Sequence, residues 1–449
     1  MTKQISEREI VLGILLEITK EGGYSHIVLR NTLEKYQYLD KKERAFITRV
    51  VEGTLEHLIE IDYIINQFSK VKVNKMKPVI RTIIRNSVYQ IKYMDSVPNS
   101  AVCNEAVKLA EKKGFFQLKG FVNGVLRNID RNVSNIQYPD KKNMVEYMSI
   151  KYSMPIWILE EWGKSYDFSV IERILQGFLE EKGTTIRCNL NKISKEELVE
   201  KLKKENVRVK EHAYLPYALE ISGYNYLGDM ESFREGDFQV QDISSMLVSE
   251  IAAPKKEDYV IDVCSAPGGK ALHMADKLGG TGYVEARDLT DYKVSLIEDN
   301  IERSGMKNIR AVQQDALICD EESKEKADIV LADLPCSGLG VLGKKTDIKY
   351  KMTRETQQEL KKLQRKILSV VQNYTKPGGT LVYSTCTINE EENIGNVRWF
   401  LKQYPQYQLV SVEDRLCDEL KPSVKEGCLQ LLPGIHNSDG FFIAKFRKD

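Results

Sequence analysis

Apolar residues recur every three or four positions along the first third of the chain. Segments such as "REIVLGILLEIT", "KPVIRTIIRNSVYQIKYM" and "GFVNGVLRNI" keep this spacing between Arg8 and Ile129, and Pro78, Pro98 and several glycines mark their ends. A period near 3.6 residues is typical of an amphipathic helix with one buried face. The pattern therefore predicts an all-α helical domain over residues 1–138.

The pattern becomes mixed over residues 139–238. The segments "WILEEWGKSY" and "KEELVEKLKKENV" have helical spacing, whereas "TTIRCNL" and "ALEISG" have the length and composition of short strands. We expect a small α+β linker domain in this region.

Short apolar runs alternate with helical segments from Gln239 to the end of the chain. The runs are "YVIDVCSA", "GYVEARD", "IRAVQQD", "ADIVLADL" and "GGTLVYSTC", and segments such as "KVSLIEDNIERSG" separate them. Strand–helix alternation predicts a doubly wound, Rossmann-like α/β domain with a mainly parallel sheet over residues 239–449. The terminal "GFFIAKFRK" is expected to add a last, antiparallel strand.

Composition narrows the class of protein. The 449 residues are 42% apolar and 29% charged, which is typical of a globular chain of two or three domains. No apolar run approaches the ~18 residues that span a bilayer. The first twenty residues carry acids throughout and have no small-residue cleavage site, so we expect no secretory signal. Eight scattered cysteines indicate reduced thiols, and no CxxC or HExxH spacing occurs. We expect a cytoplasmic protein with no membrane partner and no metal.

Basic residues are concentrated in the N-terminal part. Residues 1–140 hold 22 Lys and Arg against 16 Asp and Glu, whereas the remainder holds 44 against 49. Six basic residues and no acid lie between Val71 and Lys92, and Lys77, Arg81 and Arg85 are spaced by four. The stripe is predicted to contact nucleic-acid phosphates, although a solvated helix face has the same pattern.

Polar residues follow the ends of four predicted strands. "DVCSAPGGK" ends the first strand and opens a helix, and its pattern is neither a P-loop nor a G-x-G-x-x-G fingerprint. Acids end the next three strands, where an α/β sheet binds its ligand and where a carboxylate can accept from ribose hydroxyls. A nucleoside cofactor without phosphates fits best, which predicts S-adenosylmethionine. The predicted cofactor-binding residues are Cys264, Ser265, Ala266, Pro267, Gly268, Gly269, Lys270, Asp288, Asp315 and Asp333.

Two cysteines follow buried strands in similar contexts, in "DLPCSGLG" and "LVYSTCT". If these strands are neighbours, about 4.8 Å apart, Cys336 and Cys386 share one pocket. A thiolate is the most nucleophilic side chain, and its addition to C6 of cytosine would make C5 able to accept a methyl group. Asp333 could hold the N3/N4 edge of the base. The spacing alone does not indicate which cysteine attacks.

These motifs, together with "YSTCTINEEEN" and "FQVQDISSMLV", resemble those of the RNA cytosine-C5 methyltransferases of the RsmB/Nop type. "VPNSAVCNEAVKLAEKKG" and "GFVNGVLRNI" resemble a NusB-type RNA-binding domain, and the combination is similar to the RsmB (Sun/Fmu) group. The resemblance covers nearly the whole chain. It implies methylation of C5 of a cytosine in 16S ribosomal RNA with S-adenosylmethionine, with Cys386 as the nucleophile and Cys336 assisting product release.

Some alternatives stay open from the sequence. The substrate could be another RNA, such as a tRNA or a different ribosomal RNA site, or the chain could be a non-catalytic NusB-like RNA-binding factor. An amino-group methyltransferase would need Asn/Asp-Pro-Pro-aromatic after the fourth strand, which "DLPCSG" lacks. Leu334 and Thr346 depart from the family pattern, where Ala and Pro are usual. We expect a monomer that acts on free or partly assembled small-subunit RNA.

Overall fold

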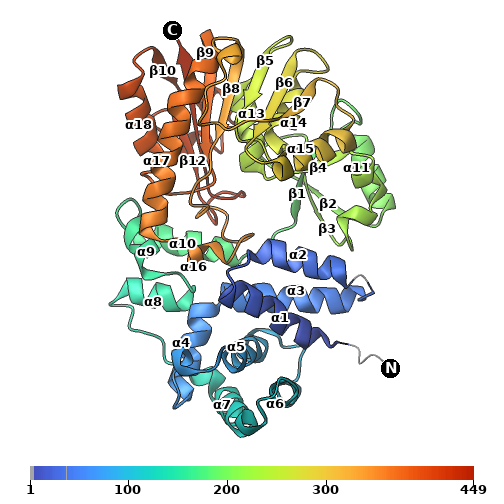
Figure 1. Cartoon of the computed structure of the whole chain (residues 1–449), viewed down its shortest axis with the longest axis vertical. Helices are drawn as coiled ribbons and strands as arrows, with labels where there is room; N and C mark the ends of the chain where they lie inside the picture. Colours follow the sequence, from blue (N-terminus) through green and yellow to red (C-terminus); the bar gives the residue numbers. More distant parts are fainter. Residues whose placement is uncertain (1–4, 37) are drawn as a thin grey trace. The chain divides into compact units, whose positions relative to one another are not determined.

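The structure, a computed structural model, describes residues 5–36 and 38–449, and these residues divide into two compact units (Figure 1). The first unit extends to Leu179 and includes residues 342–351, and the second comprises residues 180–341 and 352–449. Within the described residues, all strands belong to the second unit.

The first unit is a bundle of helices around α5 (Pro78–Tyr93), which packs against α1, α3, α4, α6 and α7 (Figure 1). Pro78 stands in the first turn of α5, where its missing N–H is not needed, as the sequence predicted. Ile80, Ile83 and Ile84 are fully buried, so the predicted helical domain is confirmed. The other helices are α1 (Glu7–Lys20), α2 (Ser25–Lys35), α3 (Lys41–Glu56), α4 (Leu58–Phe68), α6 (Asn99–Lys112), α7 (Lys119–Asn132), α8 (Met144–Lys151), α9 (Ile156–Trp162), α10 (Phe168–Leu179) and α16 (Ile348–Lys351).

The segment 342–351, which contains α16, is distant in sequence from the rest of the first unit. Asp347 accepts hydrogen bonds from the backbone N–H of Ser25 at 3.1 Å and from its hydroxyl at 2.5 Å. Lys351 donates to the carbonyl of Gly23 at 2.6 Å. Thr346, which stands where Pro is usual in the family, is 6% exposed. Its side chain therefore packs in the interior of the protein.

The second unit contains a small antiparallel sheet with the strand order β2-β3-β1-β4. Its elements are β1 (Thr184–Cys188), α11 (Lys195–Lys204), β2 (Arg208–Glu211), β3 (Ala218–Ser222), α12 (Glu231–Arg234) and β4 (Phe238–Val240). Leu198 and Leu202 of α11 are buried against Ile186 and Leu219 of the sheet. The α+β character expected from the sequence is confirmed.

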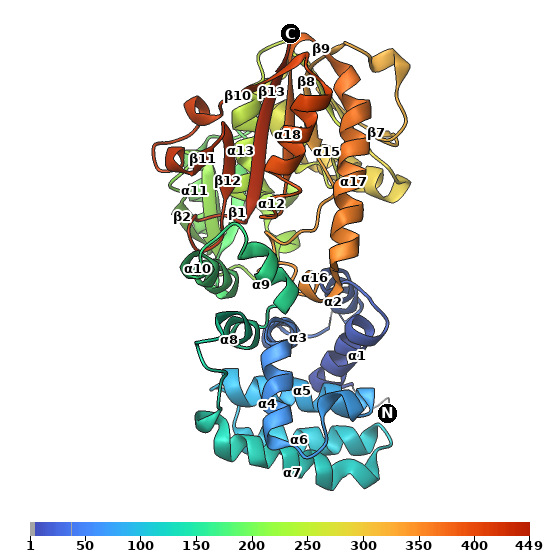
Figure 2. The same ribbon diagram turned by 90° about the vertical axis from the view of Figure 1, so that its left-hand side faces the viewer.

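The large sheet of the second unit has the order β11-β12-β13-β9-β8-β5-β6-β7, and β10 pairs with β13. Strands β5 to β9 are parallel and β13 is antiparallel, as predicted. Helices α13, α14 and α15 cover one face, and α17 and α18 cover the other (Figures 1 and 2). The strands are β5 (Tyr259–Asp262), β6 (Tyr283–Asp288), β7 (Ile309–Gln313), β8 (Ala327–Asp333), β9 (Thr375–Thr385), β10 (Tyr407–Val410), β11 (Val424–Lys425), β12 (Cys428–Leu431) and β13 (Phe441–Lys448), and the helices are α13 (Ile243–Ala252), α14 (Gly269–Lys277), α15 (Asp291–Ser304), α17 (Arg354–Val371) and α18 (Ile394–Gln403).

The register of β8 against β9 positions the candidate site. Asp333 pairs with Ser384, so these two parallel strands end at the same level. The loops that carry Cys336 and Cys386 therefore leave the sheet side by side, at the carboxyl edge where α/β sheets bind ligands.

Candidate active site

The structure brings the two motif cysteines into contact. The Sγ atoms of Cys336 and Cys386 are 3.2 Å apart, and neither is in a disulfide. The backbone N–H of Gly340 donates to the carbonyl of Cys386 at 3.0 Å. A Cβ at Gly340 would lie 2.0 Å from the carbonyl oxygen of Gly440, so only glycine permits this close approach.

A half-buried ion pair lies beside the thiols. Nζ of Lys270, at the start of α14, lies 2.7 Å from a carboxylate oxygen of Asp333. The hydroxyl of Ser384 donates to the other oxygen of Asp333 at 2.7 Å. Burial disfavours the charge of Lys270, but Asp333 and the nearby Asp262 outweigh it and raise the pKa of this ammonium group. Lys270 therefore stays cationic in a water-poor pocket.

The two thiols have opposite electrostatic neighbours. The hydrogen bond between the two thiols, burial and the nearby Glu392 carboxylate all raise the pKa of the Cys336 thiol. Cys386 instead interacts electrostatically with Lys270. A cation stabilises a thiolate and an anion disfavours it. Lys270 thus interacts with Cys386 and the Glu392 carboxylate with Cys336, a difference that the spacing of the motifs did not indicate.

The predicted cofactor loop follows β5 as a tight turn. The N–H of Gly268 donates to the carbonyl of Ser265 at 2.7 Å, and Gly268 has φ +99°, which favours glycine. The backbone N–H of Ala266 donates to Asp288 at 2.9 Å, so the acid at the end of β6 holds the loop. Burial raises the pKa of Cys264, which keeps it a neutral thiol. The remaining residues of this predicted set, Pro267, Gly269 and Lys270, complete the turn into α14.

Asp262, the last residue of β5, was not among the predicted site residues. It is 1% exposed, and neither of its carboxylate oxygens has a hydrogen-bond partner within the described residues. Burial raises its pKa to about 7, with Lys270 opposing this effect. The hydroxyl of Ser265 also lacks a partner there. Buried polar groups without partners are rare and often belong to a binding site.

The acids after β6 and β7 lie at adjacent strand ends. Asp288 is 4% exposed and also accepts from the N–H of Leu289 at 2.8 Å. Asp315 is half-buried and accepts from the N–H of Leu317 at 2.9 Å. Leu289 and Leu317 are 54% and 42% exposed, respectively. Leu289 and Leu317 therefore provide apolar surface on which a flat ring can pack. The carboxylates of Asp288 and Asp315 beside them can accept hydrogen bonds from hydroxyl groups.

The predicted basic stripe on α5 is wrong for two of its members. Arg85 makes a two-pronged ion pair with Asp62 at 2.6 and 2.7 Å. Lys92 donates to the fully buried Glu60 at 3.0 Å, and its side chain is 15% exposed. α5 is the central helix of its unit, so no face of it is fully solvated and these cations serve the fold. The exposed lysines of the region lie instead in the preceding loop, and they are Lys70, Lys72, Lys75 and Lys77.

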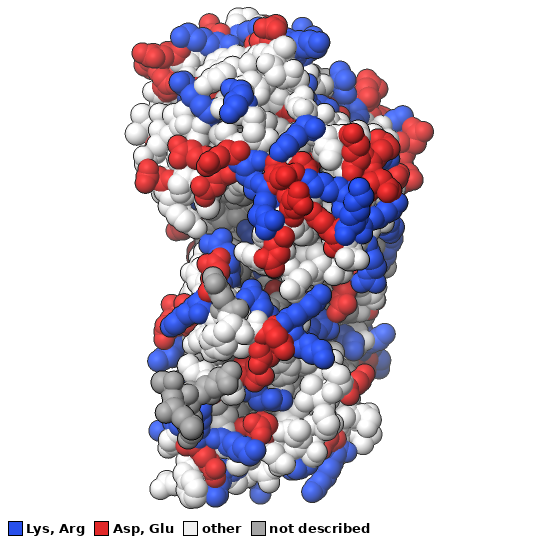
Figure 3. Space-filling model, turned by 90° about the vertical axis from the view of Figure 1, so that its right-hand side faces the viewer, with Lys and Arg blue, Asp and Glu red and all other residues white. Residues whose placement is uncertain are grey.

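Charge elsewhere on the surface is mixed. On the face drawn in Figure 3, Lys and Arg are interspersed with Asp and Glu, and no large field of one sign is seen. The excess of basic residues in the N-terminal part is therefore not expressed as one continuous patch on that face.

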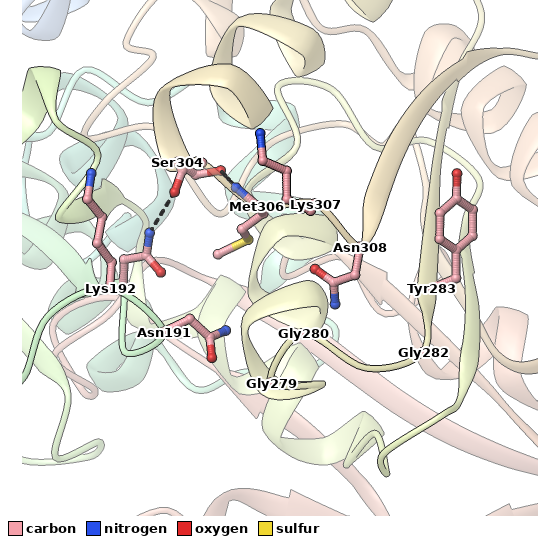
Figure 4. Close-up of a pocket in the computed structure, with 12 residues that line it drawn as sticks. Asn191, Lys192, Gly279, Gly280, Gly282, Tyr283, Ser304, Met306, Lys307 and Asn308 are labelled. Carbon is pink, nitrogen blue, oxygen red and sulfur yellow. Dashed lines mark hydrogen bonds between the residues drawn. The ribbon is translucent and has the colours of Figure 1, made fainter.

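A hollow of about 750 Å³ lies at the opposite edge of the large sheet (Figure 4). It is lined by Lys192 in the loop after β1 of the small sheet, by Gly280 in the loop before β6, by Tyr283 at the start of β6, and by Lys307 before β7. The residues before β6 and β7 lie at the amino ends of these parallel strands. Its lining, within the described chain, includes none of the cysteines or strand-end acids, so this hollow is separate from the candidate site.

The described residues contain no group of His, Cys, Asp and Glu arranged to hold a metal ion. Among the helices that the structure describes, none is long and apolar enough to cross a membrane.

Comparison with known proteins gives matches along almost the entire chain. Residues 5–131 match the NusB family, residues 154–225 match the ferredoxin-like domain of RsmF/B-like methyltransferases, and residues 249–447 match 16S rRNA methyltransferase RsmB/F. A probable ribosomal RNA small subunit methyltransferase B of Bacillus subtilis is 34% identical over 448 residues, with 99% of each chain covered. A protein of the same name from Synechocystis is 32% identical over 449 residues, covering 99% of this chain and all of the relative. The crystal structure of PH0851 is 27% identical, with a TM-score of 0.82 over 99% of both chains.

The fold and the site define a methyltransferase domain joined to a NusB-type helical domain and a small ferredoxin-like domain. The chain belongs to the RsmB/F family of 16S rRNA methyltransferases.

Proposed function

We propose that this protein transfers a methyl group from S-adenosylmethionine to C5 of a cytosine in 16S ribosomal RNA, through a covalent bond between Cys386 and C6 of the base. The observation that carries the proposal is the pair of thiols 3.2 Å apart beside the Lys270–Asp333 ion pair. Methylation of an amino group does not require two adjacent thiols. Binding of RNA without catalysis does not require the Lys270–Asp333 ion pair beside them.

The residues support a defined sequence of bond changes. The Cys386 thiolate, favoured by the Lys270 cation, adds to C6 of the cytosine, and the electrons of the C5–C6 double bond become available at C5. We assign Asp333 to the N3/N4 edge of the ring, where its carboxylate can accept a hydrogen bond from the exocyclic amino group. C5 then bonds to the methyl carbon while the bond from that carbon to the sulfonium sulfur breaks, which leaves S-adenosylhomocysteine. The C5 proton passes to water, its electron pair re-forms the C5–C6 double bond, and the C6–S bond breaks with its electrons on the Cys386 sulfur.

Cys336 is assigned to this last step. Its surroundings keep it a neutral thiol, in contact with the sulfur that must leave C6. A neutral S–H at that distance can donate a proton to the departing thiolate, which lowers the energy of elimination.

The chemistry of the loop after β5 fits S-adenosylmethionine, which when bound supplies a methyl group on a sulfonium centre. Asp262 and Ser265 provide buried polar atoms without protein partners within the described residues. Asp288 and Asp315 can accept from ribose hydroxyls, and the exposed side chains beside them can cover an adenine ring. Cations such as the sulfonium and an α-ammonium suit a site with this many acids.

Ribosomal RNA as the substrate is supported by the names of the relatives and by the NusB-type domain. Four exposed lysines in the loop before α5, Lys70, Lys72, Lys75 and Lys77, offer positive charge to phosphates. We expect the protein to act as a monomer on free or partly assembled small-subunit RNA.

The two cysteines provide the test. Cys386→Ala cannot bond to C6 and should transfer no labelled methyl group from S-adenosylmethionine to 16S RNA. Cys336→Ala should attack and methylate, then stall as a protein–RNA adduct that survives denaturation and disappears in the double variant. Cys319→Ala, in the loop after β7, is the matched control and should turn over normally. An adduct with Cys386→Ala instead would reverse the roles, and no adduct with either variant would reject the release role of Cys336.

A further inference from the structure

The loops that carry the two cysteines meet at a buried carboxylate, Glu392, which forms no bond in the reaction described above. Glu392 lies between β9 and α18 and is 0% exposed. Its Oε2 accepts from the backbone N–H of Ser337 at 2.9 Å, and its Oε1 accepts from the Ser337 hydroxyl at 2.6 Å. Ser337 directly follows Cys336. Both donors on one cysteine loop therefore converge on one carboxylate.

The same cluster reaches the other cysteine loop and α17. The hydroxyls of Ser337 and Thr387 are 2.8 Å apart, and Thr387 directly follows Cys386. Gln364 of α17 donates to Oε2 of Glu392 and to the carbonyl of Pro335, both at 2.9 Å. The residues on either side of Cys336 are thus both held by this cluster.

We propose that Glu392 is a positioning residue that fixes the separation of the Cys336 and Cys386 thiols. It touches neither thiol within the hydrogen bonds described. It acts through Ser337, whose backbone it fixes, and through the Ser337–Thr387 contact that joins the two loops. The Gly340–Cys386 backbone hydrogen bond also joins these loops, but Gly340 is four residues from Cys336, whereas Ser337 is its neighbour in the chain.

The required feature is the reach of the side chain rather than its charge. Oε2 faces the fixed backbone N–H of Ser337, so an oxygen is needed there. It also accepts from the Gln364 amide, whose own oxygen accepts from Asn396. Oε1 faces a hydroxyl that can rotate, donate to Thr387 and accept from an amide. Glu392→Gln therefore preserves the geometry, whereas Glu392→Asp keeps the charge but withdraws the carboxylate by about 1.5 Å, one carbon–carbon bond.

Disulfide trapping measures the thiol separation without reference to catalysis. A dilute azo oxidant, diamide, takes two electrons and two protons from the thiols, and the linked Cys336 and Cys386 peptides are quantified by mass spectrometry. Glu392→Asp should trap at least about tenfold more slowly than the wild-type chain, since displacements near 1 Å have large effects on such proximity. Glu392→Gln should keep most of the rate, because loss of the charge that raises the Cys336 pKa would favour thiol oxidation. Glu391→Ala, an exposed neighbour bound to Lys361, is the matched control.

The catalytic consequence rests on the proposed function and is measured separately. In labelled methyl transfer, Glu392→Asp should accumulate the same stalled adduct as Cys336→Ala, and Glu392→Gln should resolve it. Unchanged affinity for S-adenosylmethionine checks that the second unit remains folded. Normal trapping with Glu392→Asp, or equal impairment in the Asp and Gln variants, would overturn the positioning role. Absence of methyl transfer by the wild-type chain would refute the proposed function while the trapping result still tests Glu392.

Discussion

Asp262 is a buried acid without a protein partner among the described residues, and its replacement by asparagine should remove a pH-dependent cost to stability. The native carboxyl has a pKa of about 7, mainly because burial disfavours its charge, against 3.8 in an unfolded chain. Asparagine has nearly the same shape and carries no charge at any pH. The comparison therefore isolates the titration of one group.

The sign and size follow from the two pKa values. Below pH 3.8 the acid is protonated in both states and costs nothing. As the pH rises towards 7, the unfolded chain ionises first and the wild-type fold loses stability, and above 7 the loss is constant. At about 1.4 kcal/mol per pKa unit the full cost is about 4 kcal/mol. Between pH 5 and pH 8, the stability of Asp262→Asn relative to the wild-type protein should therefore rise by about 3 kcal/mol.

Hydrogen exchange followed by mass spectrometry measures this in the intact chain, because peptides covering β5 report the opening free energy of the second unit alone. Asp299→Asn, the same substitution at an exposed position of α15, should show no such change with pH. A difference between Asp262→Asn and wild type that varies by less than about 1 kcal/mol between the two pH values would refute the reasoning. The acid would then be ionised in the native state, with Lys270 compensating its burial.

Three further outcomes are expected. Asp288→Ala should weaken binding of S-adenosylmethionine by roughly 1–3 kcal/mol in calorimetry, because the N–H of Ala266 and the ligand both lose a hydrogen-bond acceptor. An unchanged affinity would contradict the assignment of Asp288 to the cofactor site. Changing the four exposed lysines of residues 70–77 to glutamine should weaken RNA binding. The slope of log affinity against log salt concentration should fall by about 0.7–0.9 per lost phosphate contact. Arg85→Gln should instead destabilise the helical unit and leave this slope unchanged. Glu60→Gln should destabilise the helical unit by roughly 3 kcal/mol at pH 7, since burial is outweighed by His57, Lys92 and two tyrosines that hold the Glu60 pKa near 2. That difference should shrink in thermal melts as the pH falls from 4.5 towards 2, and a constant difference would argue against it.

The arrangement of the site depended on strand order, which the sequence did not contain. Proximity of the two thiols required β8 and β9 to be neighbours, and the motifs suggested this only because their contexts were alike. The roles proposed for the thiols rest on the interaction of Lys270 with Cys386 and of Glu392 with Cys336. Lys270 and Cys386 are 116 positions apart in the chain. Long-range packing sets such distances, and no local pattern encodes them.

Local pattern was sufficient for the type of each domain, because periodic burial of apolar side chains decides between helix and strand over a few residues. The local sequence was also sufficient to predict the tight turn at Gly268, because the turn requires only the positive φ angle that glycine readily adopts. It failed for Arg85 and Lys92, whose spacing on a helix resembled a phosphate-binding face. The tertiary structure places α5 at the centre of its unit, where Arg85 pairs with Asp62 and Lys92 pairs with Glu60. Tertiary packing also determines the surroundings of Asp262, but with the opposite result. The fold buries this acid at the end of β5, and its carboxylate oxygens have no hydrogen-bond partner among the described residues.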